Sequence, residues 1–534
     1  MRRLAVVAAL CGACAPIWMG VARAQFGRGV GDWSTTGGDA QRSSWVRSDV
    51  KISRESLQKP GFQLVWKVKL NNEARQLNAL TPAALLTGYI GYRGFRSLGF
   101  VSGSGGRIFA LDTDLGRIEW QKPLKAATSP QGSLACPGGM TANVSRQVSA
   151  ELPPNPSGGR GMGGRARPAT SGVGEPGEGS VVLKEIAARG DAGGFRGAPP
   201  ARGRAAGPAR GPAGGFRRMP NYLHAVSSDG MFHSMYVSNG EEPEPAVKFL
   251  PPNANVLGLI VVDNVAYAAT SGACGGVPNA VWALDTASKQ VATWQPPGGA
   301  IAGSDGPAFG PDGTLYVATQ SGDLVALEAK TLKVKDVHRA GREFSSSPVV
   351  FQYKEKSLIA AATRDGRIYV VDSEVFGKPG YLSPVFVPGG DFNPGALASW
   401  QDTAGTRFVL AATANAVVAW KMVEQNGAPA LEPAWTSPDL ASPLTPFIIN
   451  GVVFAASSGE FRTSDTRMTA LEQAQRSSPA VVHALDGSTG KSLWNSGKTI
   501  ASFVHNGGLS GGGTQVYLGT HDGTLYAFGF PIEH

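Results

Sequence analysis

Ala484-Leu-Asp-Gly-Ser-Thr-Gly-Lys-Ser-Leu-Trp494 is the stretch that decides the fold of this 534-residue chain. Residues 481–485 alternate as a β-strand does, and residues 486–490 have the composition of a tight turn. The carboxylate of Asp486 can accept hydrogen bonds from the turn amides, and Gly490 supplies a positive φ that other residues adopt only at a cost. Trp494 falls on the next strand, where its ring can fill the gap between two twisted sheets. The stretch therefore predicts one hairpin of a β-propeller blade.

The same pattern, A-x-D-x-x-T-G-x-x-x-W, recurs along the chain. The two closest copies are Ala110 to Trp120, with its aspartate at Asp112, and Ala283 to Trp294, with its aspartate at Asp285. Degenerate copies lie at residues 326–328, 371–372, 419–435 and 526–528. A unit of short strands that repeats every ~45 to 60 residues is typical of radially arranged blades.

We expect an all-β fold, an eight-bladed propeller of four-stranded antiparallel blades. Its outer hairpins are predicted near residues 107–120, 231–249, 280–294, 323–337, 367–387, 416–435, 481–494, and 524–528 paired with 62–68. The last of these closes the ring, because the strand that carries Trp66 has no preceding strands of its own and would complete the C-terminal blade. Seven blades are the alternative, since the second and fifth hairpins lack the tryptophan.

The repeats, together with Asp32-Trp33, Gly37-Gly38-Asp39 and Val65-Trp66 near the start, resemble the pyrroloquinoline-quinone-like (PQQ-like) repeat. That repeat builds the quinoprotein alcohol dehydrogenase-like propellers, a superfamily that also includes the periplasmic lipoprotein of the outer-membrane β-barrel assembly machine. The resemblance covers nearly all of the chain after residue 30. It implies an eight-bladed ring, and it raises PQQ with calcium as a cofactor.

Dehydrogenases of this superfamily add features that this chain lacks. It has no pair of adjacent cysteines, no C-x-x-C-H haem motif, and no Glu, Asn and Asp set that matches the calcium ligands of the family. If the chain is nevertheless a dehydrogenase, the resemblance implies a carboxylate base, for which Asp391 and Glu343 are the candidates. These departures favour a propeller that binds without catalysing.

A ligand of such a ring would bind on the face where loops between blades gather around the axis, here called the funnel face. Arginines there suit an anionic ligand such as the tricarboxylate PQQ, because a guanidinium binds a carboxylate through two parallel hydrogen bonds. The alternative is that these side chains are turn residues and ion pairs that face water. The candidate ligand-binding residues are Arg75, Asn78, Arg339, Arg342, Arg364, His505 and Asn506.

Six of the seven histidines divide into two groups, and none of the seven forms a recognisable metal-binding pair. His224, His233 and His483 fall on predicted strands and are expected in the core. We place His338, His505 and His521 in funnel loops, which makes them the better candidates for proton transfer or ligand contact.

Residues 1–24 have two arginines, an apolar run and an Ala-Arg-Ala cleavage site, so they predict a secretory signal peptide. The mature chain, residues 25–534, keeps Cys136 and Cys274, both in glycine-rich loops. A disulfide between them is our first expectation in an oxidising compartment, and two separate thiols near a binding site are the alternative.

A second compositional feature is the segment 151–218, rich in Gly, Arg, Pro and Ala, which predicts a disordered insertion. The net charge of +9 comes from this segment, at +6, and from the signal peptide, at +3, so the rest of the chain is close to neutral. We therefore expect no nucleic-acid partner.

We expect a monomer that is periplasmic or secreted and has no membrane-spanning segment. Three functions remain. The first is a binding or scaffold propeller that offers its funnel to a small molecule or a protein, the second is a PQQ-dependent alcohol or sugar dehydrogenase, and the third is an outer-membrane protein assembly factor.

Overall fold

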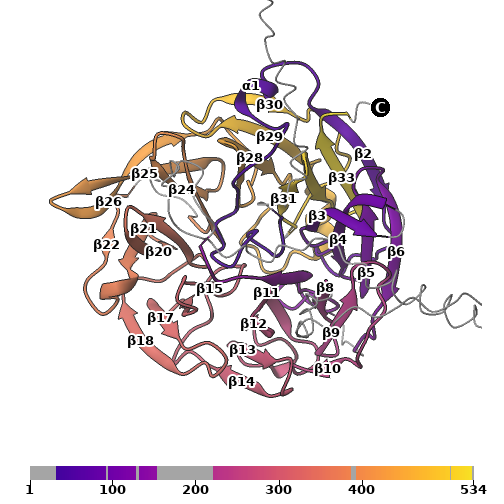
Figure 1. Ribbon diagram of the computed structural model, residues 1–534, viewed down its shortest axis with the longest axis horizontal. Helices are drawn as coiled ribbons and strands as arrows, with labels where there is room; N and C mark the ends of the chain where they lie inside the picture. The colour runs from indigo at the N-terminus through magenta and orange to yellow at the C-terminus, as the bar shows by residue number, and fades with distance from the viewer. Residues whose placement is uncertain are drawn as a thin grey trace, which may run out of the picture.

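The protein is described here from a computed structural model, which places residues 32–91, 94–127, 132–152, 221–385, 392–505 and 507–531. Its strands form eight blades around a central axis (Figure 1). This confirms the eight-bladed prediction over the seven-bladed alternative. The predicted signal peptide at 1–24 lies outside the described residues, as does nearly all of the insertion predicted at 151–218.

The first four blades are antiparallel sheets, and the second and third join through a parallel contact between β7 and β11. The first blade comprises β3 (Ala84–Gly91), β4 (Gly94–Gly103), β5 (Arg107–Asp112) and β6 (Arg117–Pro123), and the second comprises β7 (Ser145–Val148), β8 (Tyr222–Val226), β9 (Met231–Tyr236) and β10 (Val247–Lys248). The third blade comprises β11 (Asn255–Val262), β12 (Val265–Ser271), β13 (Ala280–Asp285) and β14 (Val291–Trp294). The fourth comprises β15 (Ala308–Phe309), β16 (Leu315–Ala318), β17 (Asp323–Leu327) and β18 (Val334–Arg339).

The last four blades are also four-stranded antiparallel sheets, and the short strand β1 adds to the seventh by pairing parallel with β27. The fifth blade comprises β19 (Val349–Tyr353), β20 (Lys356–Thr363), β21 (Arg367–Asp372) and β22 (Tyr381–Leu382), and the sixth comprises β23 (Leu397–Gln401), β24 (Arg407–Ala412), β25 (Val417–Gln425) and β26 (Ala428–Thr436). The seventh blade comprises β27 (Phe447–Ile449), β28 (Val452–Ser457), β29 (Val481–Asp486) and β30 (Ser492–Asn495). The eighth comprises β31 (Leu509–Gly512), β32 (Gln515–Gly519), β33 (Thr524–Gly529) and β2 (Gln63–Lys69). The remaining elements are β1 (Trp45–Val46), α1 (Arg54–Leu57), α3 (Ala470–Arg476), η1 (Cys274–Gly276) and η2 (Ser373–Val375).

The eighth blade joins the two ends of the chain, as predicted. Strand β2 pairs antiparallel with β33, so that Trp66 lies opposite Ala527 and Lys67 lies opposite Tyr526. The inner strand β31 of this blade contacts β3 of the first blade. A strand from each end of the chain thus completes one sheet, which leaves neither end as an open edge.

The predicted turn chemistry is present in the hairpins that follow the third strand of a blade. Oδ1 of Asp486 accepts hydrogen bonds from the amides of Ser488 and Thr489, at 2.9 and 3.0 Å. Gly490 has a φ of +71°. Asp112 and Asp285 accept the same pair of turn amides in their own blades.

Tryptophans of the fourth strand dock onto the turn of the next blade at three joints. Their indole N–H groups donate to a turn carbonyl, and their rings lie over a glycine where a Cβ atom would fall within 2.8 Å of the ring. The pairs are Trp66 with Thr113 O (2.7 Å) and Gly116, Trp120 with Val237 O (2.9 Å) and Gly240, and Trp435 with Gly487 O (2.9 Å) and Gly490. The glycine is needed because a side chain there would displace the ring.

The hydrophobic core consists of the interfaces between neighbouring blades. Ala360 and Ile368 of the fifth blade, for example, pack against Val409 and Trp420 of the sixth. Trp494 performs the same role at the seventh joint, where its ring lies 4.8 Å from that of Phe62 and 5.6 Å from that of Phe528. Each large side chain buried in this way contributes about 1.5–3 kcal/mol, so the ring gains stability joint by joint.

The segment that precedes β1 lies inside the ring (Figure 1). Going along residues 33–44, successive backbone or hydroxyl groups bond to the innermost strand of seven successive blades. The bonds join Trp33 O to Leu85 N, Ser34 O to Arg146 N, Thr35 Oγ1 to Leu259 O, Ala40 O to Phe309 N, Gln41 O to Val350 N, Ser43 O to Ser399 N, and Ser44 O to Ile448 N. We call residues 33–44 the central segment.

Arg42 anchors the central segment and is only 1% exposed. Its guanidinium donates to Pro307 O at 3.0 Å, Thr36 O at 2.6 Å and Gly258 O at 2.7 Å. Burial lowers the pKa of Arg42 to about 10, against the attraction of Asp305 and Asp39. The interior of the ring is therefore closed to solvent at this level, by the chain itself.

Candidate functional site

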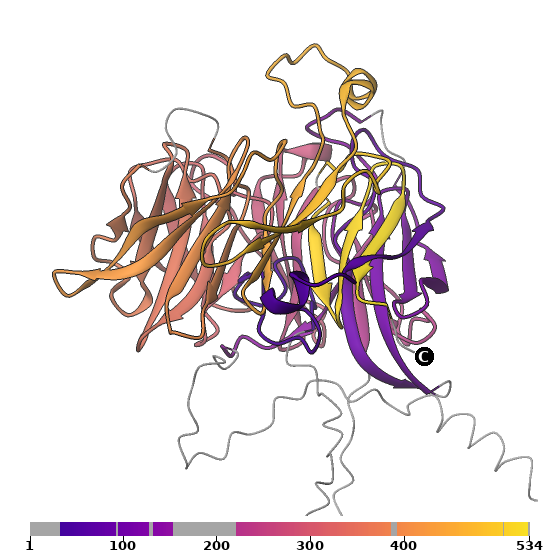
Figure 2. The same cartoon turned by 90° about the horizontal axis from the view of Figure 1, so that it is seen from above.

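The funnel face is formed by the turns between the second and third strands of each blade and by the links from one blade to the next. All the candidate ligand-binding loops that the structure describes are connections of these two kinds, at residues 70–83, 124–127, 132–144, 272–279, 340–348, 364–366, 496–505, 507–508 and 520–523. The longest such turn joins β28 to β29 in the seventh blade and carries the gold helix α3, which rises above the ring (Figure 2). Residues 458–480 are called the funnel arm below.

Helix α3 forms within the funnel arm because its first turn is capped. Thr469 accepts a hydrogen bond from the amide of Glu472, and the Glu472 side chain accepts one from the amide of Thr469, which completes a capping box. Gln473 on this helix is buried at its base. The helix thus has one face turned toward the ring.

A buried carboxylate holds the funnel arm to the ring. The side chain of Glu460 is 3% exposed, and it accepts hydrogen bonds from His505 Nδ1 at 2.6 Å, Arg462 Nε at 3.2 Å and Gln473 Nε2 at 3.4 Å. Burial raises the pKa of a carboxyl group, but here the hydrogen bond and charge of His505, with those of Arg462, outweigh it and lower the pKa of Glu460. The carboxylate stays ionised and keeps His505 in place.

A pocket of about 340 Å³ opens between the funnel arm and the eighth blade. Its wall on the arm side runs from Ala474 to Pro479, and its opposite wall comprises Ala501, Ser502 and Phe503. His521 completes the lining. We call this the funnel pocket.

His521 is held in one orientation at the funnel pocket. Its ring stacks on Phe503 with centroids 4.4 Å apart, and Nε2 lies 3.3 Å from Gln76 O, which makes Nε2 the protonated nitrogen. Burial lowers the pKa of His521 below its ordinary value, against the effect of the Gln76 hydrogen bond. A neutral imidazole at this position offers Nδ1 as an acceptor.

The predicted arginines lie on the funnel face or at its edge, but acidic side chains engage two of them. Arg342 pairs with Asp365, and Arg364 Nε lies 2.7 Å from Glu343. Arg339, at the end of β18, lies opposite Asp323 of β17. These three arginines belong to the fourth and fifth blades, across the ring from Arg75.

Arg75 and Asn78 form a small bridge of their own in the link between the eighth and first blades. His505 belongs to the Glu460 cluster described above. Two candidates, Asp391 and Asn506, lie outside the described residues. The structure therefore brings His505 and His521 to one side of the funnel face and the arginines of the fourth and fifth blades to the other.

These residues do not fit PQQ with calcium. Glu343 and Asp365 engage two of the guanidinium groups that would have to bind the cofactor's carboxylates. Within the described ranges, no three His, Cys, Asp or Glu side chains are grouped closely enough to hold a metal ion. We derive no redox step from this site.

Cys136 and Cys274 form a disulfide, the pairing that we expected first. It joins the link between the first and second blades to η1, in the turn between β12 and β13 of the third blade. The bond closes a loop across a sequence separation of 138 residues.

One histidine prediction was wrong. His338 is not in a funnel loop but on β18, 5% exposed, with Nε2 2.8 Å from the Tyr369 hydroxyl and Nδ1 3.0 Å from Phe376 O. Strand β18 ends two residues beyond the predicted end at residue 337, and this continuation places His338 beside the buried Tyr369 hydroxyl, which it supplies with a polar partner.

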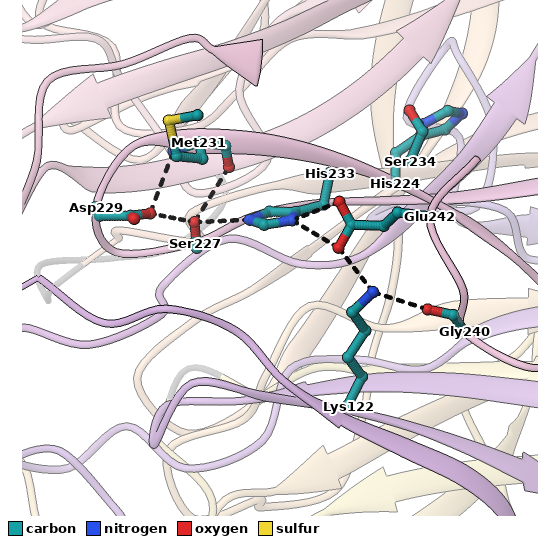
Figure 3. A network of polar contacts seen from close by, with 9 residues as sticks. All are labelled: Lys122, His224, Ser227, Asp229, Met231, His233, Ser234, Gly240 and Glu242. Carbon is teal, nitrogen blue, oxygen red and sulfur yellow. Dashed lines mark hydrogen bonds and ion pairs between the residues drawn. The ribbon is translucent and has the colours of Figure 1, made fainter. Parts of the chain in front are cut away.

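A serine, a histidine and a carboxylate line up in the second blade in the order of a nucleophile, its base and an orienting acid (Figure 3). Ser227 Oγ lies 3.0 Å from His233 Nε2, and His233 Nδ1 lies 3.2 Å from Glu242. Lys122 of the first blade also binds Glu242, at 2.7 Å.

This array is a structural feature. Ser227 is 2% exposed, and its hydroxyl donates a hydrogen bond to the Asp229 carboxylate. The same hydrogen bond within a turn joins Thr363 to Asp365 and Thr520 to Asp522 in other blades. The contacts from His233 to Lys122 tie the first blade to the second.

The Glu460 cluster and the funnel arm were not predicted from the sequence. The available signal was the length of the connection, 23 residues between β28 and β29 where the fifth and eighth blades use a short Thr-x-Asp-Gly turn, together with the capping box at Thr469 and Glu472. The hydrogen bond from His505 to Glu460 joins two separate loops, which no local pattern reveals.

No protein-family model and no curated protein matches this chain. Solved structures do. The quinohemoprotein alcohol dehydrogenase from Comamonas testosteroni is 13% identical, with 96% of this chain and 82% of that chain aligned and a TM-score of 0.55. A europium-containing methanol dehydrogenase is 12% identical over 94% of this chain and 98% of that chain, also with a TM-score of 0.55.

A third structure, BamB from Moraxella catarrhalis, is 12% identical over 89% of this chain and 99% of that chain, with a TM-score of 0.46. In the part of the chain that the structure describes, no helix is both long and apolar enough to span a bilayer. The chain has a propeller fold similar to that of these two dehydrogenases.

Proposed function

We propose that this protein is an exported binding or scaffold propeller that holds a small molecule or a partner segment in the funnel pocket and catalyses no reaction. The observation that carries the proposal is the funnel arm. A hydrogen bond between His505 and the buried Glu460 fixes the arm against the ring, and a capped helix stiffens it. The arm walls a pocket of about 340 Å³ that also presents the oriented imidazole of His521. Rigid walls with a few placed polar groups are what a binding site needs.

Two further observations support binding rather than redox catalysis. The central segment fills the interior of the ring and is hydrogen-bonded to seven blades, with Arg42 closed off from solvent. Two of the four arginines considered for an anionic cofactor, Arg342 and Arg364, are engaged by Asp365 and Glu343.

The disulfide supports export. Disulfides persist in oxidising compartments and are rare in the cytosol, so the Cys136–Cys274 bond agrees with the signal peptide predicted at residues 1–24 and with a periplasmic or secreted location.

The competing proposal is a PQQ-dependent alcohol or sugar dehydrogenase, which the fold permits. Purified protein is mixed with PQQ and calcium, and tryptophan fluorescence is recorded before an assay with a dye acceptor and a panel of alcohols and aldoses. We expect neither quenching nor dye reduction. Substrate-dependent dye reduction would overturn the proposed function.

A ligand screen tests the binding proposal directly. The thermal midpoint is measured with amino acids, sugars, dicarboxylates and short peptides as probes. We expect at least one class to raise the midpoint of the wild type and of the surface control Glu355→Gln, and to have no effect on Ala501→Trp, which fills the funnel pocket, or on His521→Ala. Probes that act equally on all four proteins, or on none, contradict the proposal.

A further inference from the structure

A second pocket lies at the joint between the fourth and fifth blades, away from the funnel pocket. Its volume is about 580 Å³. The fourth blade contributes Ala326 and Asp336 to its lining, and the fifth contributes Ser373, Phe376 and Gly377. We call it the joint pocket.

The joint pocket occupies the place that a docking tryptophan holds elsewhere. In four other blades an alanine of the third strand lies opposite the tryptophan of the outermost strand. These register pairs are Ala110 with Trp120, Ala419 with Trp435, Ala484 with Trp494, and Ala527 with Trp66. In the fourth blade the same register pairs Ala326 with Asp336. An aspartate therefore stands where the indole would be, and the pocket is the space that the indole leaves.

The acceptor for an indole N–H also has an equivalent at this joint. At the three docked joints the indole donates to the carbonyl of the first residue after the third strand, namely Thr113, Val237 and Gly487. The third strand of the fifth blade is β21, which ends at Asp372, so the equivalent residue is Ser373. Ser373 lines the joint pocket.

Aromatic rings line one side of the space. Phe376 is buried and its ring lies 5.5 Å from that of Tyr316, which also lines the pocket. His338 fixes the turn through its hydrogen bond to Phe376 O. A flat ring entering the pocket would meet Phe376 and Tyr316, in the offset or edge-to-face contacts that aromatic pairs prefer.

The polar side of the pocket favours a cation. Lys335 is engaged by Asp312 at 3.6 Å and by the Thr314 hydroxyl at 2.6 Å. The other charged residues of the lining are two carboxylates, Asp336 and Glu374, and one cation, Lys378. Carboxylates at the edge of an apolar slot suit an ammonium group attached to a ring.

We propose that the joint pocket binds an aromatic amine, a flat ring with an N–H donor and a cationic side arm. The ring would occupy the vacant tryptophan position between Ala326 and the turn of the fifth blade, its N–H would donate to the carbonyl of Ser373, and its ammonium group would pair with Asp336. The pocket is separate from the funnel pocket, and this inference does not depend on the proposed function.

Isothermal titration calorimetry with two probes tests the inference. Tryptamine has the ring, the N–H and the ammonium group, and indole-3-propionate has the same ring with a carboxylate. We expect tryptamine to bind the wild type and Glu355→Gln equally, and Asp336→Asn about two- to fivefold more weakly, because one charged contact at the edge of the pocket is lost. Indole-3-propionate should bind none of these proteins.

Filling the pocket gives an independent readout. Asp336→Trp restores the docking residue, so it should abolish tryptamine binding and raise the thermal midpoint. Asp336→Lys, which keeps the pocket open, should no longer bind tryptamine and should bind indole-3-propionate. Ala501→Trp, in the funnel pocket, should leave tryptamine binding unchanged. No tryptamine binding to the wild type, or equal affinity for Asp336→Asn and the wild type, would overturn the proposal.

Discussion

At three joints between blades, a glycine lies against the indole of a docking tryptophan. A Cβ atom on Gly490 would lie 2.5 Å from Cε3 of Trp435, and the residue has a φ of +71°. At Lys289, the equivalent position of the third blade, φ is +60° without a glycine, and there the preceding blade has no docking tryptophan. Glycine is thus required for the ring contact more than for the turn itself.

Gly490→Ala should therefore lower the free energy of unfolding by about 2–4 kcal/mol, the sum of left-handed strain and a displaced ring. Gly427→Ala is the matched control, since Gly427 has a φ of +76° and nothing within 4 Å of an added Cβ. It should cost only about 1–2 kcal/mol. Urea unfolding measures both, and equal losses would show that the ring contact adds nothing.

His224 should make stability depend on pH. Burial lowers its pKa to about 4 in the folded protein, where its ring stacks on Phe232 and binds Ser234. An unfolded histidine titrates near pH ~6.5, so the unfolded chain binds more protons between these values and stability falls as the pH drops from ~6.5 to about 4.

In His224→Phe, which keeps a flat ring beside Phe232, the fall in stability over this pH range should be smaller than in the wild type. Urea midpoints at a series of pH values measure the slope. Parallel curves for the two proteins would show that His224 does not contribute to it.

Among the elements, the disulfide is the one covalent tie that the structure shows between distant loops of the described chain. It links the segment before β7 to η1, across the second blade. Without it, both loops rely on turn hydrogen bonds of the kind seen between Ser133 and Cys136.

Replacing both cysteines by serine should lower the free energy of unfolding by about 2–5 kcal/mol, because the unfolded chain regains the freedom of a long loop. Thermal or denaturant unfolding without reductant measures the loss. Dithiothreitol should reproduce it in the wild type and leave the double variant unchanged. A variant as stable as the oxidised wild type would contradict this prediction.

At the scale of the whole molecule, the central segment makes the ring one cooperative unit. A propeller without it would hold together through contacts between neighbours alone. Here residues 33–44 reach seven blades, and the Arg42 guanidinium bonds to Gly258 O of the third blade and to Pro307 O next to the fourth.

Arg42→Met should cost about 3–5 kcal/mol, since it leaves buried carbonyl groups without donors and Asp305 without a nearby positive charge. Arg467→Met is the control, at a side chain that is 90% exposed, and should change stability by less than about 0.5 kcal/mol. Urea unfolding followed by both fluorescence and circular dichroism checks the loss and its cooperativity. Equal midpoints for the two variants would show that the Arg42 contacts are dispensable.

The sequence by itself determined the blade unit and the closing pair of strands, and it favoured eight blades over seven. Those features depend on local signals, such as Asp486, Gly490 and Trp494 at fixed spacing, that recur in several blades. Only the tertiary structure decided that Glu460 binds His505, that the Arg342 and Arg364 side chains are engaged by carboxylates, and that residues 33–44 line the ring. Side chains far apart in the chain make these contacts, and their partners are set by how blades and loops meet in space.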